Sequence, residues 1–377
     1  MSIKTYKYRL YPNKTQTLLI NEQLFEACNL YNVALEQRIR AYKSAQKSLS
    51  FYDQSKELKQ LRYEKLCGIA NFSVSQDVLK RLDKTYKAFF NRIKRGEKAG
   101  FPRFKSARRY NTFTYPIYRN GCKLIGNRIY LQGIGNIRIK LHRPVEGVIK
   151  TVSITRKNSK YYIAFCCEIP NEPLPVVNKE VGIDMGIENF AVTSDEEFVE
   201  NPRHYASAKG KNRILHRSVN RKMGGGSNNK KAQHLLSKQK EKIANQRIDF
   251  LHKLSTKIVK ENDIICIENL NISKMSCSML SREINNAGWG IFFNMLTYKA
   301  ENAGRDLIKV NPAGTSQRCN KCGTTVKKDL SVRWHDCPVC GESVHRDLNS
   351  ALEILRLGTS LCEPTCGISQ SVSQKVV

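Results

Sequence analysis

The stretch VGIDMG at residues 181–186 decides the fold of the C-terminal half, because it is typical of a short buried strand that ends in a carboxylate, Asp184. A second apolar run of the same form ends in Glu268, and Asp347 stands at the head of a later helical pattern. Carboxylates at the ends of buried strands can hold two divalent cations, and two such ions catalyse phosphodiester cleavage. Each acid alone could equally be a solvated loop residue, whereas the three together favour a metal site.

The expected chemistry at these acids is in-line displacement at phosphorus. One ion would activate a water molecule, and the other would stabilise the leaving oxygen. Asp184 would bridge both ions, while Glu268 and Asp347 would hold one or both. Magnesium is the expected cation because carboxylate oxygens suit hard cations, with manganese as a substitute. Asn349 either helps to orient Asp347 or only caps or faces solvent, and the sequence leaves both alternatives open.

The composition points to a polyanionic partner. The chain of 377 residues carries 64 lysine and arginine residues against 33 aspartate and glutamate residues, a formal net charge of +31. Nucleic acid is therefore the first candidate partner and a membrane surface the second. Basic residues run along nearly the whole length, which favours an extended nucleic-acid channel over a short localisation signal. Since no signal peptide and no membrane-length apolar run is evident, we expect a cytoplasmic protein that acts at the nucleoid.

Four of the thirteen cysteines have paired spacing, in two C-x-x-C pairs separated by fourteen residues and each followed by a glycine. They are Cys319, Cys322, Cys337 and Cys340. Two thiolate pairs on tight turns predict a closed, tetrahedral and therefore structural metal site. Zinc fits this ligand set best, and an iron centre is the alternative that the same ligands permit. The other cysteines are scattered, as expected in a reducing compartment.

The N-terminal half shows two kinds of hydrophobic periodicity, one typical of strands and one typical of helices. Residues 1–11 alternate like a basic strand, and helical patterns occupy most of 15–95. From 101 to 169 the period changes to two, with glycine and asparagine turns between the runs, which predicts a small antiparallel barrel or sandwich. The N-terminal strand could complete this barrel, and the helical block would then be an insertion.

The C-terminal half alternates strands and helices. We expect strands at 180–185, 264–268 and 307–310, a hairpin partner at 191–193, and helices at about 230–260, 289–303 and 347–356. The last twenty residues, from Gly358, lack periodicity and predict a disordered tail.

Four motifs occur together in this chain. They are Gly182-Ile183-Asp184-Met185-Gly186, Ile267-Glu268-Asn269-Leu270, Thr315-Ser316-Gln317-Arg318-Cys319 with both cysteine pairs, and Arg346-Asp347-Leu348-Asn349-Ser350-Ala351. The combination resembles the TnpB family, which comprises accessory proteins of bacterial and archaeal insertion sequences and is related to type V CRISPR nucleases. Residues 7–12, 246–255 and 298–305 also match the family, so the resemblance covers nearly the whole chain except the tail.

The resemblance implies an α/β multidomain protein. A small antiparallel β-barrel, the wedge domain of residues 1–14 and 106–178, would carry an inserted helical recognition domain, 15–105. A RuvC-like nuclease domain on an RNase H-like sheet, 179–357, would contain an inserted zinc ribbon, 315–343, and precede the tail, 358–377. The three acids would be the nuclease trio.

The implied activity is RNA-guided cleavage of target DNA beside a short flanking motif, with a guide RNA made from the transposon end. We expect one protein chain per guide RNA, with an oligomer as the alternative. A non-catalytic RNA-guided regulator and a miniature CRISPR-associated effector are alternative functions on the same scaffold. Two positions depart from the family pattern: Gly314 stands where an aromatic residue is frequent, and His345 where an acid is frequent.

Three basic clusters are the expected nucleic-acid contacts: Lys4, Lys7 and Arg9; Arg103, Lys105, Arg108 and Arg109; and Arg213, Arg217, Arg221 and Lys222. Positive charge follows phosphates, whereas Phe101, Phe104 and Tyr110 beside the second cluster either stack on bases or belong to the core. The third cluster either contacts the guide RNA or the heteroduplex or is only a solvated face. In the helical block, core positions are expected for Tyr52, Tyr63 and Tyr86.

Overall fold

The computed structural model describes residues 1–362 except 65, 276, 278–279 and 330. The chain divides into two compact units, Met1–Pro170 and Asn171–Val377. Among the described residues, no helix combines the length and apolarity that a bilayer span requires.

The first unit is built on a seven-stranded antiparallel sheet that curls into a near-closed barrel, with strand order β2-β6-β7-β1-β5-β4-β3. The N-terminal strand β1 (Ser2–Tyr11) lies in the middle, between β7 (Lys160–Ile169) and β5 (Gly135–Lys140). The predicted antiparallel barrel, completed by the N-terminal strand, is therefore confirmed. The other strands are β2 (Thr112–Tyr115), β3 (Cys122–Ile125), β4 (Arg128–Leu131) and β6 (Val148–Lys157).

Alternation along β1 explains its central place. Tyr6, Tyr8 and Leu10 are buried, while Lys7 between them is exposed, because successive side chains of a strand point to opposite faces. The residues of the turn between β6 and β7 likewise explain its conformation. Asn158 and Ser159 both have left-handed φ angles, 48° and 59°, the conformation that a tight hairpin needs.

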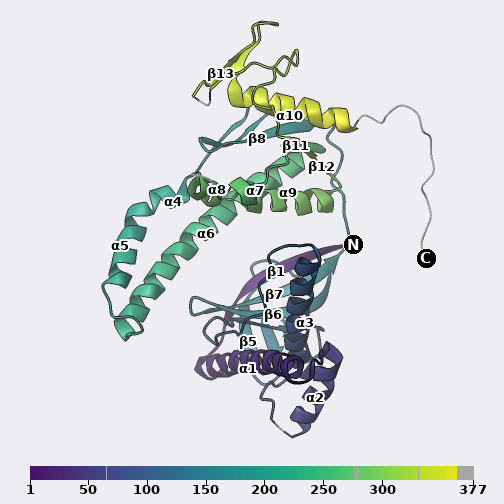
Figure 1. Cartoon of the computed structure of the whole chain (residues 1–377), viewed down its shortest axis with the longest axis vertical. Coiled ribbons are helices and arrows are strands. Elements are labelled where there is room, and N and C mark those ends of the chain that lie inside the picture. The colour runs from purple at the N-terminus through teal and green to yellow at the C-terminus, as the bar shows by residue number, and fades with distance from the viewer. Residues whose placement is uncertain (65, 276, 278–279, 330, 363–377) are drawn as a thin grey trace, which may run out of the picture. The chain divides into compact units, whose positions relative to one another are not determined.

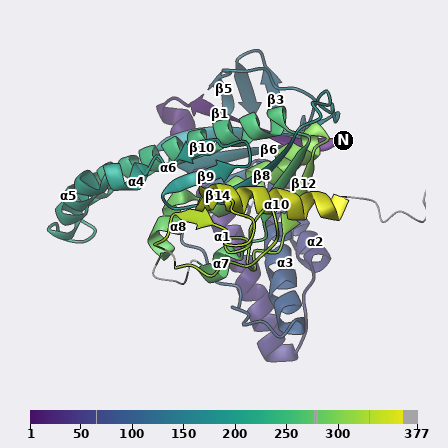
Figure 2. The ribbon, with the colours of Figure 1, turned by 90° about the horizontal axis from the view of Figure 1, so that it is seen from above.

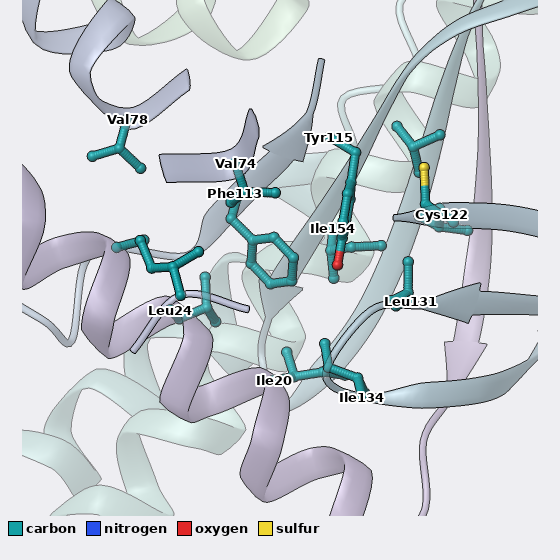
Figure 3. Packing of buried hydrophobic residues seen from close by; sticks show 14 of the residues in the cluster. Ile20, Leu24, Val74, Val78, Phe113, Tyr115, Cys122, Leu131, Ile134 and Ile154 are labelled. Carbon is teal, nitrogen blue, oxygen red and sulfur yellow. The ribbon is translucent and has the colours of Figure 1, made fainter. Parts of the chain in front are cut away.

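Three helices follow β1 in the chain: α1 (Lys14–Ala45), α2 (Phe51–Tyr63) and α3 (Phe72–Lys94). Helices α1 and α3 pack on the barrel at β2, and α2 packs on α3. Asn13 and Ser50 begin the first two with capping boxes, and Asn71 caps the third. Figure 3 shows Ile20 and Leu24 of α1 and Val74 and Val78 of α3 around Phe113 of β2. Helices and barrel therefore share one core, so the inserted block is not a separately packed body.

The prediction that Tyr52 and Tyr63 are core residues is wrong, because both side chains are exposed. Helix α2 buries only the face that carries Gln54 and Leu58, and the two tyrosines lie off that face. Tyr86 does pack against the core as a partly buried residue.

The second unit contains a mixed five-stranded sheet with strand order β10-β9-β8-β11-β12. β8 (Glu180–Met185) lies in the middle and is parallel to β11 (Ile264–Glu268), which is parallel to β12 (Asp306–Val310). On the other side β9 (Asn189–Thr193) pairs antiparallel with β8, as the predicted hairpin requires, and β10 (Phe198–Glu200) follows it.

Helices cover both faces of this sheet. Figure 1 shows α6 (Ser227–Glu261) and α9 (Trp289–Ala303) on one face and α10 (Arg346–Cys362) on the other. Short elements complete the unit: α4 (His204–Ser207), α5 (Lys209–Asn220), α7 (Ile272–Met275), α8 (Ser281–Ala287), β13 (Trp334–Asp336) and β14 (Ser343–His345).

Three details differ from the sequence-based expectation. The segment between β10 and α6 contains α4 and α5 where no helix was predicted. Helix α10 continues to Cys362, past the predicted start of the tail at Gly358, and the tail from 363 lies outside the described residues. Residues 171–178, which the resemblance places in the wedge domain, bond instead to the second unit, since Leu174 N–H donates to Ala303 O and Val177 N–H donates to Asp263.

Candidate active site and metal centre

Two of the predicted acids lie side by side on adjacent parallel strands. Ile183 of β8 is opposite Ile267 of β11, so Asp184 and Glu268 follow at the same level. Both isoleucines are buried in the core that α6 and α9 share. Because side chains alternate along a strand, the two acids point to the opposite face, the one that α10 covers.

Helix α10 brings the third acid to this face. A Cβ at Gly182, on the same face as Asp184, would meet the Ala351 carbonyl oxygen of α10 at 2.1 Å. The missing side chain therefore lets the helix lie directly on β8, as Figure 2 shows from above. Asp347 is in the first turn of α10, four residues before Ala351, and so lies one turn nearer the helix start.

The three carboxylates interact electrostatically. The pKa of Asp184 lies well above its ordinary value, first because the group is buried and then because Glu268 and Asp347 are negatively charged. Arg346 and a backbone N–H lower it by less. Burial also raises the pKa of Glu268. Acids held together against their own repulsion are typical of functional sites, and a cation would relieve that repulsion.

Thr315 fixes the orientation of Glu268, a contact that sequence reasoning missed. The Thr315 hydroxyl donates to Glu268 Oε1 at 2.5 Å, and both residues are buried. This hydrogen bond partly offsets the rise in the Glu268 pKa. The available signal was the position of Thr315 at the head of the motif before the first cysteine pair.

The four predicted cysteines converge on one point. Their sulfur atoms all lie within 4.8 Å of one another, with Cys319–Cys340 at 3.6 Å and Cys322–Cys337 at 3.5 Å. Zinc–sulfur bonds of about 2.3 Å give tetrahedral edges of about 3.8 Å, so the cluster fits a zinc ion. The predicted four-cysteine site is confirmed as a geometry, and its ligand set suits a structural ion.

The two cysteine pairs are built alike. In each pair the glycine after the second cysteine has a left-handed φ, 74° at Gly323 and 71° at Gly341, and its N–H donates to the first cysteine's carbonyl. The first cysteine's N–H in turn donates to a carbonyl five residues later, at 2.9 and 2.8 Å. Each pair is thus a turn that points both sulfur atoms inward. Hydrogen bonds from Thr324 lower the pKa of the Cys322 thiol to about 6, which favours the thiolate that a metal needs.

Asn349 neither contacts solvent nor bonds to Asp347 in the structure. Its side chain is fully buried and bridges α10 to the first cysteine turn. Nδ2 donates to the Arg318 carbonyl at 2.7 Å, and Oδ1 accepts from the Asn320 N–H at 3.1 Å. The solvent-facing alternative is therefore wrong. Asn349 joins the ribbon to the helix that carries Asp347, and a role in orienting Asp347 stays a prediction.

A second contact joins the same two segments. Glu353 on α10 is fully buried and accepts from Arg318 at 3.2 Å and from Arg356 at 2.7 Å. Removing one partner of a buried ion pair is costly, because the other charge is left without compensation. Sequence reasoning missed this pair too, since helical spacing alone does not identify a partner outside the helix.

The first basic cluster divides between two faces of the barrel wall. Lys7 and Arg9 lie on the outward face, beside the ring of Tyr162 at 4.7 and 5.2 Å. Lys4 instead forms an ion pair with Glu146 at 3.3 Å. The structure therefore groups Lys7 with Arg9 and separates Lys4 from them.

Arg9 also lines a polar cavity of about 870 Å³ in the first unit. Arg108 of the second cluster, Arg156 and Lys157 line it as well, and none of the lining residues that the structure describes is acidic. Neutral donors complete the lining, among them Asn21 and residues of the β6–β7 turn. A concave surface with several cations and amides suits a phosphate backbone.

The remaining predicted cations are exposed. Arg103, Lys105 and Arg109 lie on a strap that Asn32 holds at the Lys105 backbone, at 2.8 Å in both directions. Phe101 and Phe104 are half exposed, so core burial does not account for them, whereas Tyr110 is buried. In the second unit the exposed cations lie on α5 and just after it: Arg213, Arg217, Arg221 and Lys222.

Comparison with known families gives three matches along the chain. Residues 164–279 match OrfB_IS605, "Probable transposase". Residues 289–354 match "Cas12f1-like, TNB domain", and residues 1–47 match HTH_OrfB_IS605, "Helix-turn-helix domain". The two larger matches contain Asp184, Glu268, Asp347 and the four cysteines.

Curated relatives extend over most of the chain. A "Putative RNA-guided DNA endonuclease" of Streptomyces pristinaespiralis is 31% identical over 97% of this chain and 91% of its own length. A "Putative RNA-guided DNA endonuclease InsQ" of Escherichia coli (strain K12) is 33% identical over 78% of this chain and 75% of its own. "TnpB-like protein L770" of Acanthamoeba polyphaga mimivirus is 28% identical over 59% and 46%.

Proposed function

Because the chain belongs to the TnpB family, also described as IS605 OrfB, we propose that it is an RNA-guided DNA endonuclease that cuts by metal-dependent phosphodiester hydrolysis. The observation that carries this proposal is the meeting of Asp184, Glu268 and Asp347 on one face of the second sheet. Two of the relatives named above carry the name "Putative RNA-guided DNA endonuclease", and the acids would supply this chain with a matching chemistry.

The sheet order supports a RuvC-like domain of the RNase H type. Three strands joined as an antiparallel meander, β10-β9-β8, continue into two parallel strands, β11 and β12. The ribbon is inserted between β12 and α10, so the acid on α10 comes directly after it. The zinc cluster is thus part of the frame of the proposed active centre.

Magnesium fits the acidic cluster by its chemistry. The raised pKa of Asp184 indicates uncompensated negative charge, and hard oxygen ligands suit this ion. Asp184, Glu268 and Asp347 would hold it, with manganese as a substitute. Bound there, the ions supply a more acidic water molecule and neutralise charge on the leaving oxygen. The chain's own contribution is to hold three acids in fixed places: Thr315 restrains Glu268 and α10 positions Asp347.

The proposed guide RNA and target DNA would meet the basic surfaces of both units. Among the described residues that line the cavity with Arg9 and Arg108 none is acidic, and α5 lies in a stretch of sequence, 201–240, that contains no aspartate or glutamate. Sequence recognition would come from base pairing, with the protein contacting backbones and a short duplex motif. Affinity for RNA should then fall steeply with salt.

The test is cleavage by the purified full chain with its copurified RNA. The RNA is sequenced, a plasmid carrying a matching target beside a randomised flank is supplied, and Mg²⁺ is added. We expect Asp184→Asn, Glu268→Gln and Asp347→Asn each to lower the cleavage rate by at least about 100-fold while RNA binding is retained.

Asp195→Asn is the matched control, because Asp195 is an exposed acid in the turn between β9 and β10 whose pair with Lys179, at 2.7 Å, contributes little. If the wild-type complex binds target without cutting, the protein is an RNA-guided regulator and not a nuclease. If Asp184→Asn still cuts, the acids have been assigned the wrong role.

A further inference from the structure

An aromatic side chain lies on the same row of the sheet as the proposed active-site acids. Phe198 of β10 is opposite Val192 of β9, and Val192 is opposite Asp184 of β8. Directly paired residues point to the same face, and neighbouring strands are about 4.8 Å apart. Phe198 is therefore on the face of the acids, roughly 10 Å from Asp184 along the row.

Two more rings continue from Phe198 toward the ribbon. His345 of β14 contacts Phe198 edge-on, with ring centroids 5.2 Å apart. Trp334 of β13 is the cross-strand partner of His345, and their centroids are 6.2 Å apart. Figure 2 shows β14 and the start of α10 beside β9 and β10. We name these three residues the aromatic rim.

The two outer rings of the aromatic rim are exposed although they are apolar, and His345 between them is half-buried. Trp334 is 56% exposed and Phe198 41% exposed, and neither packs into the core clusters of the second unit. Exposed aromatic rings beside a nucleic-acid site serve as stacking surfaces, which contribute about 1–3 kcal/mol per base. A base inside a duplex has no free face, so such a surface selects unpaired nucleotides.

The aromatic rim is also connected to the third acid. Nδ1 of His345 accepts a hydrogen bond from the Asp347 N–H at 3.3 Å. The ring between Phe198 and Trp334 therefore stands two residues before Asp347, at the entrance of the helix that carries it. A nucleotide stacked on the rim would leave its neighbouring phosphate within reach of the acids.

We propose that Phe198, His345 and Trp334 form a stacking site for an unpaired base of the DNA strand whose phosphodiester is cut at Asp184. The proposal rests on the proposed nuclease function, since it names the form of DNA that this site accepts. It requires the strand to be single-stranded on the rim side of the scissile phosphate.

Tryptophan fluorescence tests the rim directly. The chain has two tryptophans, and the other, Trp289, is only 3% exposed. Subtracting the spectrum of Trp334→Leu from that of the wild type isolates Trp334. Full-length protein with its copurified RNA is titrated with fluorescein-labelled oligothymidylate without Mg²⁺. We expect at least half of the Trp334 emission to be quenched at saturation, and about 5-fold weaker binding of the oligonucleotide by Trp334→Leu.

The control and the decisive outcomes are as follows. Val339→Ala removes an exposed apolar side chain of the same ribbon, 68% exposed, and should change neither binding nor quenching. Trp334→Tyr should restore most of the affinity, because a ring is retained. Zinc content verifies that each variant keeps its ribbon. Anisotropy that saturates while Trp334 emission stays constant would overturn the proposal.

Cleavage separates this proposal from the nuclease proposal. In Trp334→Leu and Phe198→Leu we expect KM for target DNA to rise about 5-fold with kcat within about twofold, whereas Asp184→Asn loses kcat. Quenching without any wild-type cleavage would refute the nuclease and retain only the binding of an unpaired base at the aromatic rim. Cleavage that is unchanged in both rim variants would refute only the stacking site.

Discussion

The two ligand clusters of the second unit differ in how completely the chain assembles them before any ion binds. The four sulfur atoms lie within 4.8 Å of one another on two matching turns. Among the described residues no set of three carboxylates lies within 4.8 Å of one another, so the oxygen atoms of Asp184, Glu268 and Asp347 are spaced more widely than the sulfur atoms. They also come from a strand, its neighbour and a helix, and they repel one another. The cysteine cluster thus suits a closed structural ion, whereas the proposed metal site at the acids would have to admit substrate.

The largest expected effect comes from opening the closed cluster. Cys337→Ser removes a buried sulfur ligand and should abolish stoichiometric zinc binding, with a fall in Tm of about 10 °C or more. Metal analysis and thermal unfolding measure it. Cys277→Ser, at an exposed thiol, is the control and should leave both unchanged. A Cys337→Ser protein that keeps one zinc per chain would contradict the ligand assignment.

The next effect tests whether the closed cluster supports the open one. Asn349→Ala leaves the Arg318 carbonyl and the Asn320 N–H without their buried partner and should cost about 2–4 kcal/mol of unfolding free energy. Zinc should stay bound while cleavage declines, because Asp347 loses its link to the ribbon. Asn228→Ala, at an exposed helical position, is the matched control. Unchanged stability would mean that the bridge is dispensable.

A smaller effect, of opposite sign, tests the strain of the open cluster. The pKa of Asp184 is raised in the folded protein, so the ionised form disfavours folding at neutral pH. Asp184→Asn should raise the metal-free Tm by a few degrees at pH 7. The difference should shrink as pH falls toward the ordinary aspartate value, about 4. Mg²⁺ should raise the Tm of the wild type and not that of the variant. Thermal unfolding of both proteins at pH 7 and at about pH 4 measures these differences.

The smallest effect contrasts Asp184 with Lys299, a partly buried lysine outside both clusters. Burial lowers the pKa of Lys299 to about 8, and its ammonium donates to Ser255, Thr256 and the His252 carbonyl. The unfolded chain then binds more protons between pH 8 and about 10.4, so stability rises with pH there. The unfolding free energy of the wild type, measured by denaturant titration, should therefore rise relative to that of Lys299→Met between pH 8 and pH 10. A pH-independent difference would contradict the shift.

Much of the site could be predicted because its signals are local. The runs before Asp184 and Glu268 are short and apolar, and the cysteine spacing has one obvious geometry. The hairpin at 191–193 and the helix at 289–303 likewise follow from periodicity. In each case the sequence pattern that supports the prediction lies within a few residues of the side chain or element concerned.

What could not be predicted depends on contacts between distant segments. Asn349 meets the first cysteine turn only after the ribbon has folded, and Arg318 finds Glu353 across the same interface. Tyr52 and Tyr63 were misplaced because helical spacing does not say which face of α2 is covered. Helices α4 and α5 were missed because their basic composition hides the apolar period.

The close approach of Gly182 to Ala351 has a consequence for synthesis of the protein. Translation delivers β8 and β11 well before the helix that covers them, so a nascent chain ending before Arg346 carries two of the acids and no third. Domains generally fold as they emerge from the ribosome, N-terminal parts first. The order of the chain thus places assembly of the proposed active site after the synthesis of Asp347, and a product truncated before Arg346 would lack one of its three acids.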